Sequence, residues 1–230
     1  MYDNNTSKQQ LTVNTMDFKR ARSEEQRQLR ITQFLDTAAM LYEEEGYDKV
    51  SLTQISKVLN FHRNNVYNYF NCKEDLFLTL ILRDLSDAIE DGIATFSQKL
   101  ELEEFGRVFT QLLMRHQRLL DLASITNTTI LGFASPNIHK RFRLQLKTIQ
   151  DKLLTCLQSG IFKNVGINEL QTLFYKINIY TLQLYIRSIQ YKERHRIPVF
   201  NDVGYAPINF ELAATAYIDG LIADLKNKKS

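Results

Sequence analysis

The chain has little glycine, little proline and no tryptophan. Its 230 residues include 8 Gly, 3 Pro and 2 Cys. A shortage of turn-forming residues disfavours an all-β fold, which needs many turns, and favours long helices. The two cysteines, Cys72 and Cys156, lie far apart and lack the spacing of metal ligands, which indicates reduced thiols in a cytoplasmic protein.

Long apolar runs are also missing. No window reaches the roughly 18 uninterrupted apolar residues of a membrane span. The N-terminal segment is polar and has no apolar core of the kind that a secretory signal requires. Hydrophobic residues still make up 44% of the chain, which is enough for a sizeable core. We therefore expect a cytoplasmic globular protein that does not enter a membrane.

Motifs of common enzymes are absent as well. The sequence has no Gly-rich phosphate loop, no Gly-x-Ser-x-Gly and no His-Glu-x-x-His. The four histidines are dispersed at positions 62, 116, 139 and 195, which disfavours a histidine metal site. We expect no catalytic residues, no metal and no cofactor beyond a small-molecule effector of unknown identity.

What the chain does have is helical periodicity. Residues 1–22 read as a flexible polar arm. From Arg27 the apolar residues fall on one face of an amphipathic helix, and Gly46 supplies its end. The residues of this face are Ile31, Phe34, Leu35, Ala38, Leu41 and Tyr42.

Two short helices follow. Ser51-Leu-Thr-Gln54 has the pattern of a capping box, with Ser51 as the N-cap. The helix that it opens breaks at Asn60–Phe61, and a second short helix is expected over residues 62–69. A long helix then starts at Asn71 or Cys72. Two short helices joined by a tight break form a helix-turn-helix, whose second helix enters the major groove of DNA.

The second short helix has an unusual composition. The stretch FHRNNVYNYFNCKED at 61–75 gathers three asparagines, two tyrosines, a histidine and an arginine in its first ten residues, and residues 51–73 contain no acid. Such groups donate hydrogen bonds to phosphates and base edges, whereas carboxylates would be repelled by a polyanion. An acid-free window of this length also arises by chance, so the window alone is weak support.

These residues resemble the DNA-binding domain of TetR-type (tetracycline-repressor family) transcription regulators. The resemblance covers residues 31–77, about a fifth of the chain. The matching positions are Ala38-Ala39, Gly46-Tyr47, Ser51, Ile55-Ser56, Tyr67, Phe70, Lys73 and Glu74. The sequence departs from the family at His62, where Ser is usual, and at Asn64, where Gly is usual.

The resemblance and the chemistry of the side chains together give a set of candidate DNA contacts. The set consists of Ser51, Thr53, His62, Arg63, Asn64, Asn65, Tyr67, Asn68 and Lys73. Arg63 is the candidate for a phosphate or a guanine, and the asparagines are candidates for adenine edges. Tyr67 and Lys73 are assigned to phosphates. Each has a plainer alternative: caps for Ser51 and Thr53, fraying turns for the asparagines, core packing for Tyr67, and a solvated side chain for His62, Arg63 and Lys73.

The rest of the chain is expected to be helical too, over about 102–119, 120–133, 136–159, 168–192 and 209–226. Ser135-Pro136 and Asn168 with Gln171 mark helix starts, and Gly160 marks an end. Residues 193–208 read as a long connection. The predicted architecture is all-α, with an arm over 1–22, a three-helix DNA-binding domain over 23–75, and a helical ligand-binding and dimerisation domain over 76–230.

The last two helices, about 168–192 and 209–226, have broader apolar faces than one packing partner needs. The resemblance implies that they pair with their copies in a homodimer, with Ala213, Ala216 and Gly220 allowing close approach; the alternative is two ordinary core helices. A ligand pocket is expected between about 80 and 185. The polar residues His116, Asn127, Thr128, Thr129 and Asn178 fall in apolar surroundings there, and none is favoured as a ligand contact.

The predicted function is a dimeric transcriptional regulator, a repressor that binds a palindromic operator and is released by a small, largely apolar ligand. A ligand-independent protein of the same fold that organises DNA through protein partners is the alternative. A helical enzyme with an incidental helix-turn-helix is the third hypothesis, and no motif supports it. The operator, the ligand and the regulated genes do not follow from the sequence.

Overall fold

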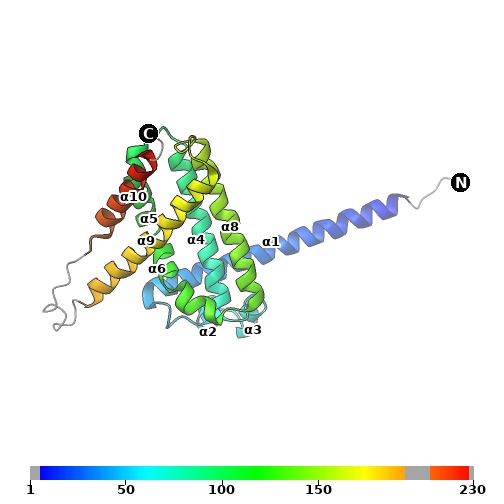
Figure 1. The fold of residues 1–230 in the computed structure, drawn as a ribbon. Helices are drawn as coiled ribbons and strands as arrows, with labels where there is room; N and C mark the ends of the chain where they lie inside the picture. Colours follow the sequence, from blue (N-terminus) through cyan, green and yellow to red (C-terminus); the bar gives the residue numbers. More distant parts are fainter. Residues whose placement is uncertain (1–5, 195–207, 228–230) are drawn as a thin grey trace. The chain divides into compact units, whose positions relative to one another are not determined.

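Helices account for all the regular structure in the described part of the chain (Figure 1). The computed structural model describes residues 6–194 and 208–227; the side chains of residues 6–22, of Arg63 and of residues 190–194 lie outside the description. The all-α prediction is confirmed. In the described ranges no helix is long and apolar enough to cross a membrane.

The chain divides into two compact units, Met1–Phe77 and Leu78–Ser230. The first contains α1 (Thr6–Glu45), α2 (Leu52–Val58), α3 (Arg63–Tyr67) and the first residues of α4 (Lys73–Phe96). We expected an arm over 1–22, but the backbone is helical from Thr6; residues 1–5 lie outside the described residues.

The first unit is held together by aromatic packing around α1. Phe34 is fully buried, and its ring lies 6.2 Å from that of Phe70 and 5.3 Å from that of Tyr69. Phe77 is also fully buried and lies 4.9 Å from the ring of Tyr47. Burying a large apolar side chain contributes roughly 1.5–3 kcal/mol. These contacts therefore fix α3 and the start of α4 against α1.

Gly46 ends α1 as the sequence predicted. Its φ is +81°, in the left-handed region where a Cβ is disfavoured, and its N–H donates to the Tyr42 carbonyl at 2.9 Å. The break after α2 has a similar cause at Asn60, whose φ of 56° turns the chain toward α3. Asparagine tolerates this conformation better than most residues.

The second unit begins within α4 and continues through a series of shorter and longer helices. These are η1 (Leu102–Glu104), α5 (Phe105–Arg115), α6 (Gln117–Ile125), the π-helical η2 (Thr126–Ile130), α7 (Leu131–Phe133), α8 (Pro136–Ser159), α9 (Ile167–Arg194) and α10 (Phe210–Asn227). Ser135 and Gly160 cap α8 as predicted. The expected connection over 193–208 lies almost wholly outside the described residues.

Three boundaries differ from those predicted. The helices expected over 102–119 and 120–133 instead break at His116, whose backbone leaves the helical region, and again at the π turn of η2. The long helix expected from Asn71 or Cys72 begins at Lys73. The helix α9 begins at Ile167, so Asn168 lies inside it and is not its N-cap.

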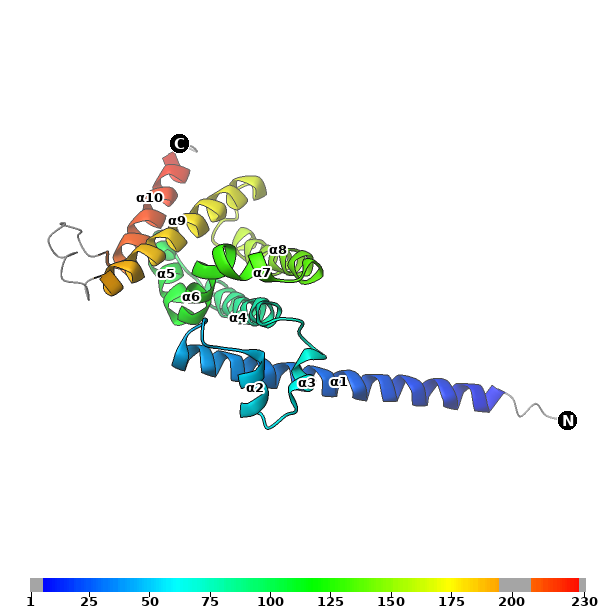
Figure 2. The same ribbon diagram turned by 90° about the horizontal axis from the view of Figure 1, so that it is seen from below.

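The core of the second unit lies among α4, α5, α8, α9 and α10. Phe105, Phe162 and Leu170 are among its fully buried residues. Figure 2 shows α10 beside α5 and α9. Gly106 permits the α5–α10 packing, because a Cβ at this position would collide with the carboxylate of Asp219.

Candidate nucleic-acid interface and effector cavity

Both short helices of the first unit are capped by side chains. Ser51 Oγ accepts a hydrogen bond from the Gln54 N–H at 3.2 Å, which confirms its predicted role as N-cap. The reciprocal half of the predicted capping box is replaced, because the Gln54 amide donates to Glu45 at 2.8 Å. Ser51 is exposed and Thr53 half-buried.

His62 caps α3. Its Nδ1 accepts a hydrogen bond from the Asn64 N–H at 3.4 Å, and its backbone is extended. This is the geometry that a serine provides at an N-cap, so the substitution of His for the usual family residue keeps the cap while adding a larger, exposed side chain.

The α3 helix has one buried face and one exposed face. Val66 is fully buried and Phe70, three residues past the end of the helix, is 5% exposed, so these two residues seat the segment on the core. The exposed face carries Asn64, Asn65, Asn68 and Tyr67, the last of which is 41% exposed. The structure therefore presents these four candidate contacts together; the side chain of Arg63 is outside the description.

Lys73 makes contacts within its own unit. Its Nζ donates to the Tyr47 carbonyl at 3.0 Å and lies 4.1 Å from the centre of the Tyr47 ring. An ammonium has three N–H donors, so this backbone bond leaves donor capacity for another partner. The lysine thus links the α1–α2 connection to the start of α4, a role that the sequence did not suggest.

The nearby carboxylates are engaged by neighbours in the same unit. The Tyr47 hydroxyl donates to Glu74 Oε1 at 3.0 Å, and the Asn71 amide donates to Asp75 Oδ2 at 3.1 Å. Burial, followed by the charge of Glu74, raises the pKa of Tyr47 well above its ordinary value, so the phenol stays protonated as a donor. Burial likewise raises the pKa of Cys72 to about 11, which keeps this thiol unreactive at neutral pH.

A groove between α1 and α3 was missed by the sequence analysis. It has a volume of about 740 Å³ and is lined by Ser23, Gln26, Arg27, Leu29, Arg30, Gln33, Asn65, Asn68 and Tyr69. Two arginines and four amides therefore face a space with no carboxylate among its lining residues. The guanidinium of Arg30 lies 4.2 Å from the Phe61 ring centre and donates to Gln33 at 2.9 Å.

A sequence signal for these arginines existed. Arg27 precedes Ile31 by four residues, and Arg30 precedes Phe34 by four residues, so both arginines continue the buried face of α1 toward the chain start. The predicted site was restricted to residues 51–73, and this restriction excluded α1.

In the second unit, five helices enclose a small cavity of about 80 Å³. Its walls are mainly apolar, with Leu85 and Ile89 from α4, Phe109 and Leu112 from α5, and Phe174 from α9. Its polar lining residues are His116, Gln150 and Asn178. Two of the five polar residues noted in the sequence, His116 and Asn178, are thus brought together, whereas Asn127, Thr128 and Thr129 lie on η2 and do not line it.

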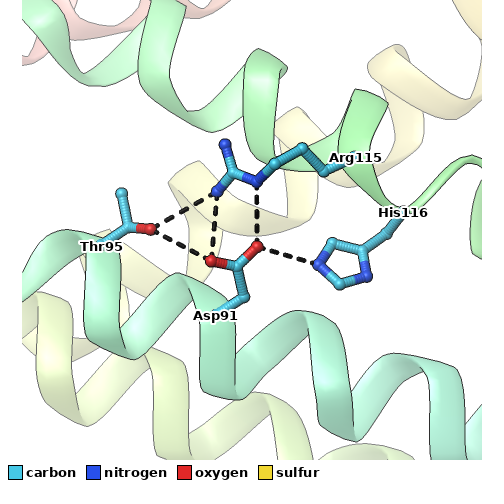
Figure 3. A network of polar contacts seen from close by, with 4 residues as sticks. All are labelled: Asp91, Thr95, Arg115 and His116. Carbon is cyan, nitrogen blue, oxygen red and sulfur yellow. Dashed lines mark hydrogen bonds and ion pairs between the residues drawn. The ribbon is translucent and has the colours of Figure 1, made fainter.

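His116 belongs to a polar network around Asp91 of α4 (Figure 3). Asp91 accepts hydrogen bonds from Arg115 Nε at 3.0 Å and Arg115 Nη2 at 3.2 Å, and its Oδ2 lies 3.0 Å from His116 Nε2. Arg115 is the main cause that lowers the pKa of Asp91. The network joins α4 to the α5–α6 break, which explains why the helix ends at residue 115.

No group of His, Cys, Asp and Glu in the described part of the chain is arranged to hold a metal ion. The geometry described so far consists of a supported helix-turn-helix with an exposed polar face in one unit and an apolar cavity in the other.

Comparison with known protein families decides the nature of the first unit. Residues 34–80 match the family described as bacterial regulatory proteins, tetR family. Residues 34–80 form a TetR-type DNA-binding domain. The resemblance noted in the sequence is confirmed, and so is the DNA-binding regulator class that it implies.

The fold that surrounds the TetR-type domain is shared with solved regulators. The FadR transcriptional regulator of Bacillus subtilis, solved in complex with stearoyl-CoA, is 18% identical; the match covers 83% of this chain and 96% of that one, with a TM-score of 0.53. A TetR/AcrR family regulator of Thermobifida fusca is 18% identical over 84% and 96% of the two chains, with a TM-score of 0.52. These likenesses show the fold. No curated protein sequence matches the chain.

Proposed function

We propose that this protein is a dimeric transcriptional repressor that binds a palindromic operator and is released by a small, largely apolar effector. In this proposal, residues 23–75 bind DNA, and residues 76–230 bind the effector and dimerise through α9 and α10. The observation that carries the proposal is the exposed polar face of α3 within a TetR-type domain. Acting on DNA, such a regulator works in the cytoplasm.

The nine candidate residues divide into two groups by the part of DNA that each would contact. Arg63, Asn64, Asn65 and Asn68 read base edges, since Arg pairs with guanine and Asn with adenine. Ser51, Thr53, His62, Tyr67 and Lys73 hold phosphates, which supply affinity without sequence information. The groove of Arg27 and Arg30 adds a further phosphate position beside α3.

The effector would bind at the apolar cavity that His116 and Asn178 line. A ligand releases DNA if it binds more tightly to the conformation that binds DNA poorly. The relative from Bacillus subtilis was solved with stearoyl-CoA, which supports a ligand with an apolar portion.

The test is selection of DNA fragments from the source genome, with Arg63→Ala as the variant. We expect a few palindromic sites that the variant loses while its circular dichroism is unchanged. Lys73→Ala should weaken binding to all sequences and reduce the salt slope by about one. Recovery of unrelated sequences that the variant binds equally well would contradict the assignment of α3 as the reading helix.

A ligand-independent DNA-organising protein is the second candidate. The small volume of the cavity favours it, because pockets for drug-sized ligands usually measure roughly 300–1,000 Å³. Many genomic sites without a palindrome would support this candidate over the repressor.

A further inference from the structure

The N-terminal half of α8 carries positive charge that DNA recognition by α3 does not use. From Leu122 to Gln150 the sequence contains no Asp or Glu, and the segment includes Lys140, Arg141, Arg143 and Lys147. All four of these side chains are exposed. By contrast, Arg83, Arg107, Arg115 and Arg118 in the same unit each lie within 4.0 Å of a carboxylate.

Three of the four cations share one side of the helix with a residue at the edge of the cavity. Lys140, Arg143 and Lys147 follow each other at spacings of three and four residues, and Gln150 comes three residues later. Such spacing aligns side chains along one side of an α-helix. Gln150 is exposed and also lines the cavity, so it marks the cavity mouth.

The partners of these cations are mostly neutral. Arg143 donates to the Asn127 side chain of η2 and to His139, each at 3.5 Å. Lys147 pairs with Asp151 at 2.5 Å, which compensates part of its charge. Lys140 and Arg143 therefore form the centre of the uncompensated charge.

The elements that line the cavity lead directly to this charge. Along α8, Arg143 precedes Gln150 by seven residues, which corresponds to about 10 Å at 1.5 Å per residue. On the other side, α6 supplies Leu119 and Leu120 to the cavity and continues into η2, where Asn127 contacts Arg143. Figure 2 shows α7, which follows η2, beside α8. An apolar site and a cationic site are thus adjacent within one unit.

We infer that the effector is an amphipathic anion: an acyl chain whose phosphate-bearing head binds Lys140 and Arg143 while its apolar end enters the cavity at Gln150. This inference rests on the proposed function, since it names the class of the effector. Two uncompensated cations with a third nearby exceed what a single carboxylate needs and suit a multiply charged phosphate head. The cavity admits the end of the chain, and longer chains displace the partly buried side chains of its wall.

The test compares four ligands by isothermal titration calorimetry on the full chain: octanoyl coenzyme A, octanoate, octanol and coenzyme A without an acyl group. We expect octanoyl coenzyme A to bind most tightly, because it alone provides both portions. Octanoate binding as tightly as octanoyl coenzyme A would overturn the phosphate head, and octanol doing so would overturn the anionic head altogether.

The decisive variant is Lys140→Gln with Arg143→Gln. We expect it to weaken octanoyl coenzyme A roughly tenfold, as loss of two charge-assisted contacts at an exposed site implies, and to leave octanol within about twofold. The matched control is Arg141→Gln with Lys152→Gln, which removes two exposed charges from the opposite side of α8. Equal weakening by both variants would overturn the inference.

A gel shift with selected genomic DNA separates the two levels of the argument. Wild-type protein that binds its DNA but none of the acyl anions refutes only the class of the effector. Protein that neither binds selected DNA nor responds to a ligand refutes the repressor function itself.

Discussion

At the scale of single residues, Lys73 and His116 show how position changes a side chain's role. Lys73 lies where the resemblance implies a phosphate contact, yet it also bonds to the Tyr47 carbonyl and lies over the Tyr47 ring. His116 lines the cavity and reaches Asp91 across two helices. Neither set of contacts follows from sequence neighbours, because the partners lie 26 and 25 residues away.

Asp91 gives a prediction about pH and stability. Its pKa is lowered in the folded state by Arg115 first, so its contribution to folding is present above the unfolded pKa of about 3.9 and is lost as the pH falls through the folded value. Asp91→Asn should therefore lower the free energy of unfolding at about pH 7 by roughly 1 kcal/mol, a modest value because the carboxylate is partly exposed.

Urea denaturation of wild type and variant at about pH 7 and about pH 3 measures this difference. We expect the gap between the two proteins to narrow at the lower pH. Asp87→Asn, at an exposed position one turn earlier in α4, is the control and should change little. A gap that widens in acid would contradict the direction of the pKa shift.

At the scale of elements, α3 is too short to be stable alone. It has five residues, whereas isolated helices of fewer than about 12 residues are marginal in water. Three features hold it: the His62 cap, the buried Val66, and the aromatic packing of Tyr69 and Phe70 on Phe34. The polar face can be rich in asparagine, a poor helix former, because these features supply the stability.

The cap gives a prediction for α3. His62→Ala should lower the free energy of unfolding of the DNA-binding unit by about 1 kcal/mol, because the Asn64 N–H loses its acceptor. His62→Ser should retain the stability, since serine is a favoured cap. Urea denaturation followed by circular dichroism checks both variants. Equal loss in the two would indicate that the ring, rather than the cap, is what matters.

At the scale of the whole molecule, α9 and α10 leave apolar side chains exposed. Tyr175 is 68% exposed, Ile179 48% and Leu212 69%. On α10, Ala216 and Gly220 are exposed small residues, and nothing lies within 4 Å of a Cβ placed on Gly220. An apolar face with small residues suits close packing against a second copy, and contiguous exposed apolar groups commonly mark interfaces.

This face predicts the effect of charge on assembly. Tyr175→Glu combined with Ile179→Glu should convert a dimer into a monomer at micromolar concentration and weaken palindromic DNA, because two linked half-sites bind more tightly than one. Light scattering coupled to size exclusion reports the mass. Leu144→Glu, an exposed apolar position on α8, is the matched control and should remain dimeric. A dimeric double variant would place the interface elsewhere.

The sequence by itself determined the helical class and the location of the TetR-type domain. Periodicity specified α1, and caps at Ser51, Ser135 and Gly160 specified where α2 begins and where α8 begins and ends, because these signals act over three or four residues. The composition of 61–75 identified α3 as the polar helix for the same reason: each residue type reports its own chemistry.

Tertiary structure alone decided which distant residues share a site. Arg27 and Arg30 join Asn65 and Asn68 in one groove only because Phe34 packs α1 against α3. The break at His116 exists because Asp91, on another helix, takes hydrogen bonds from both Arg115 and His116. Contacts between segments many residues apart depend on how whole faces pack, and a local pattern in one segment contains no record of its partner.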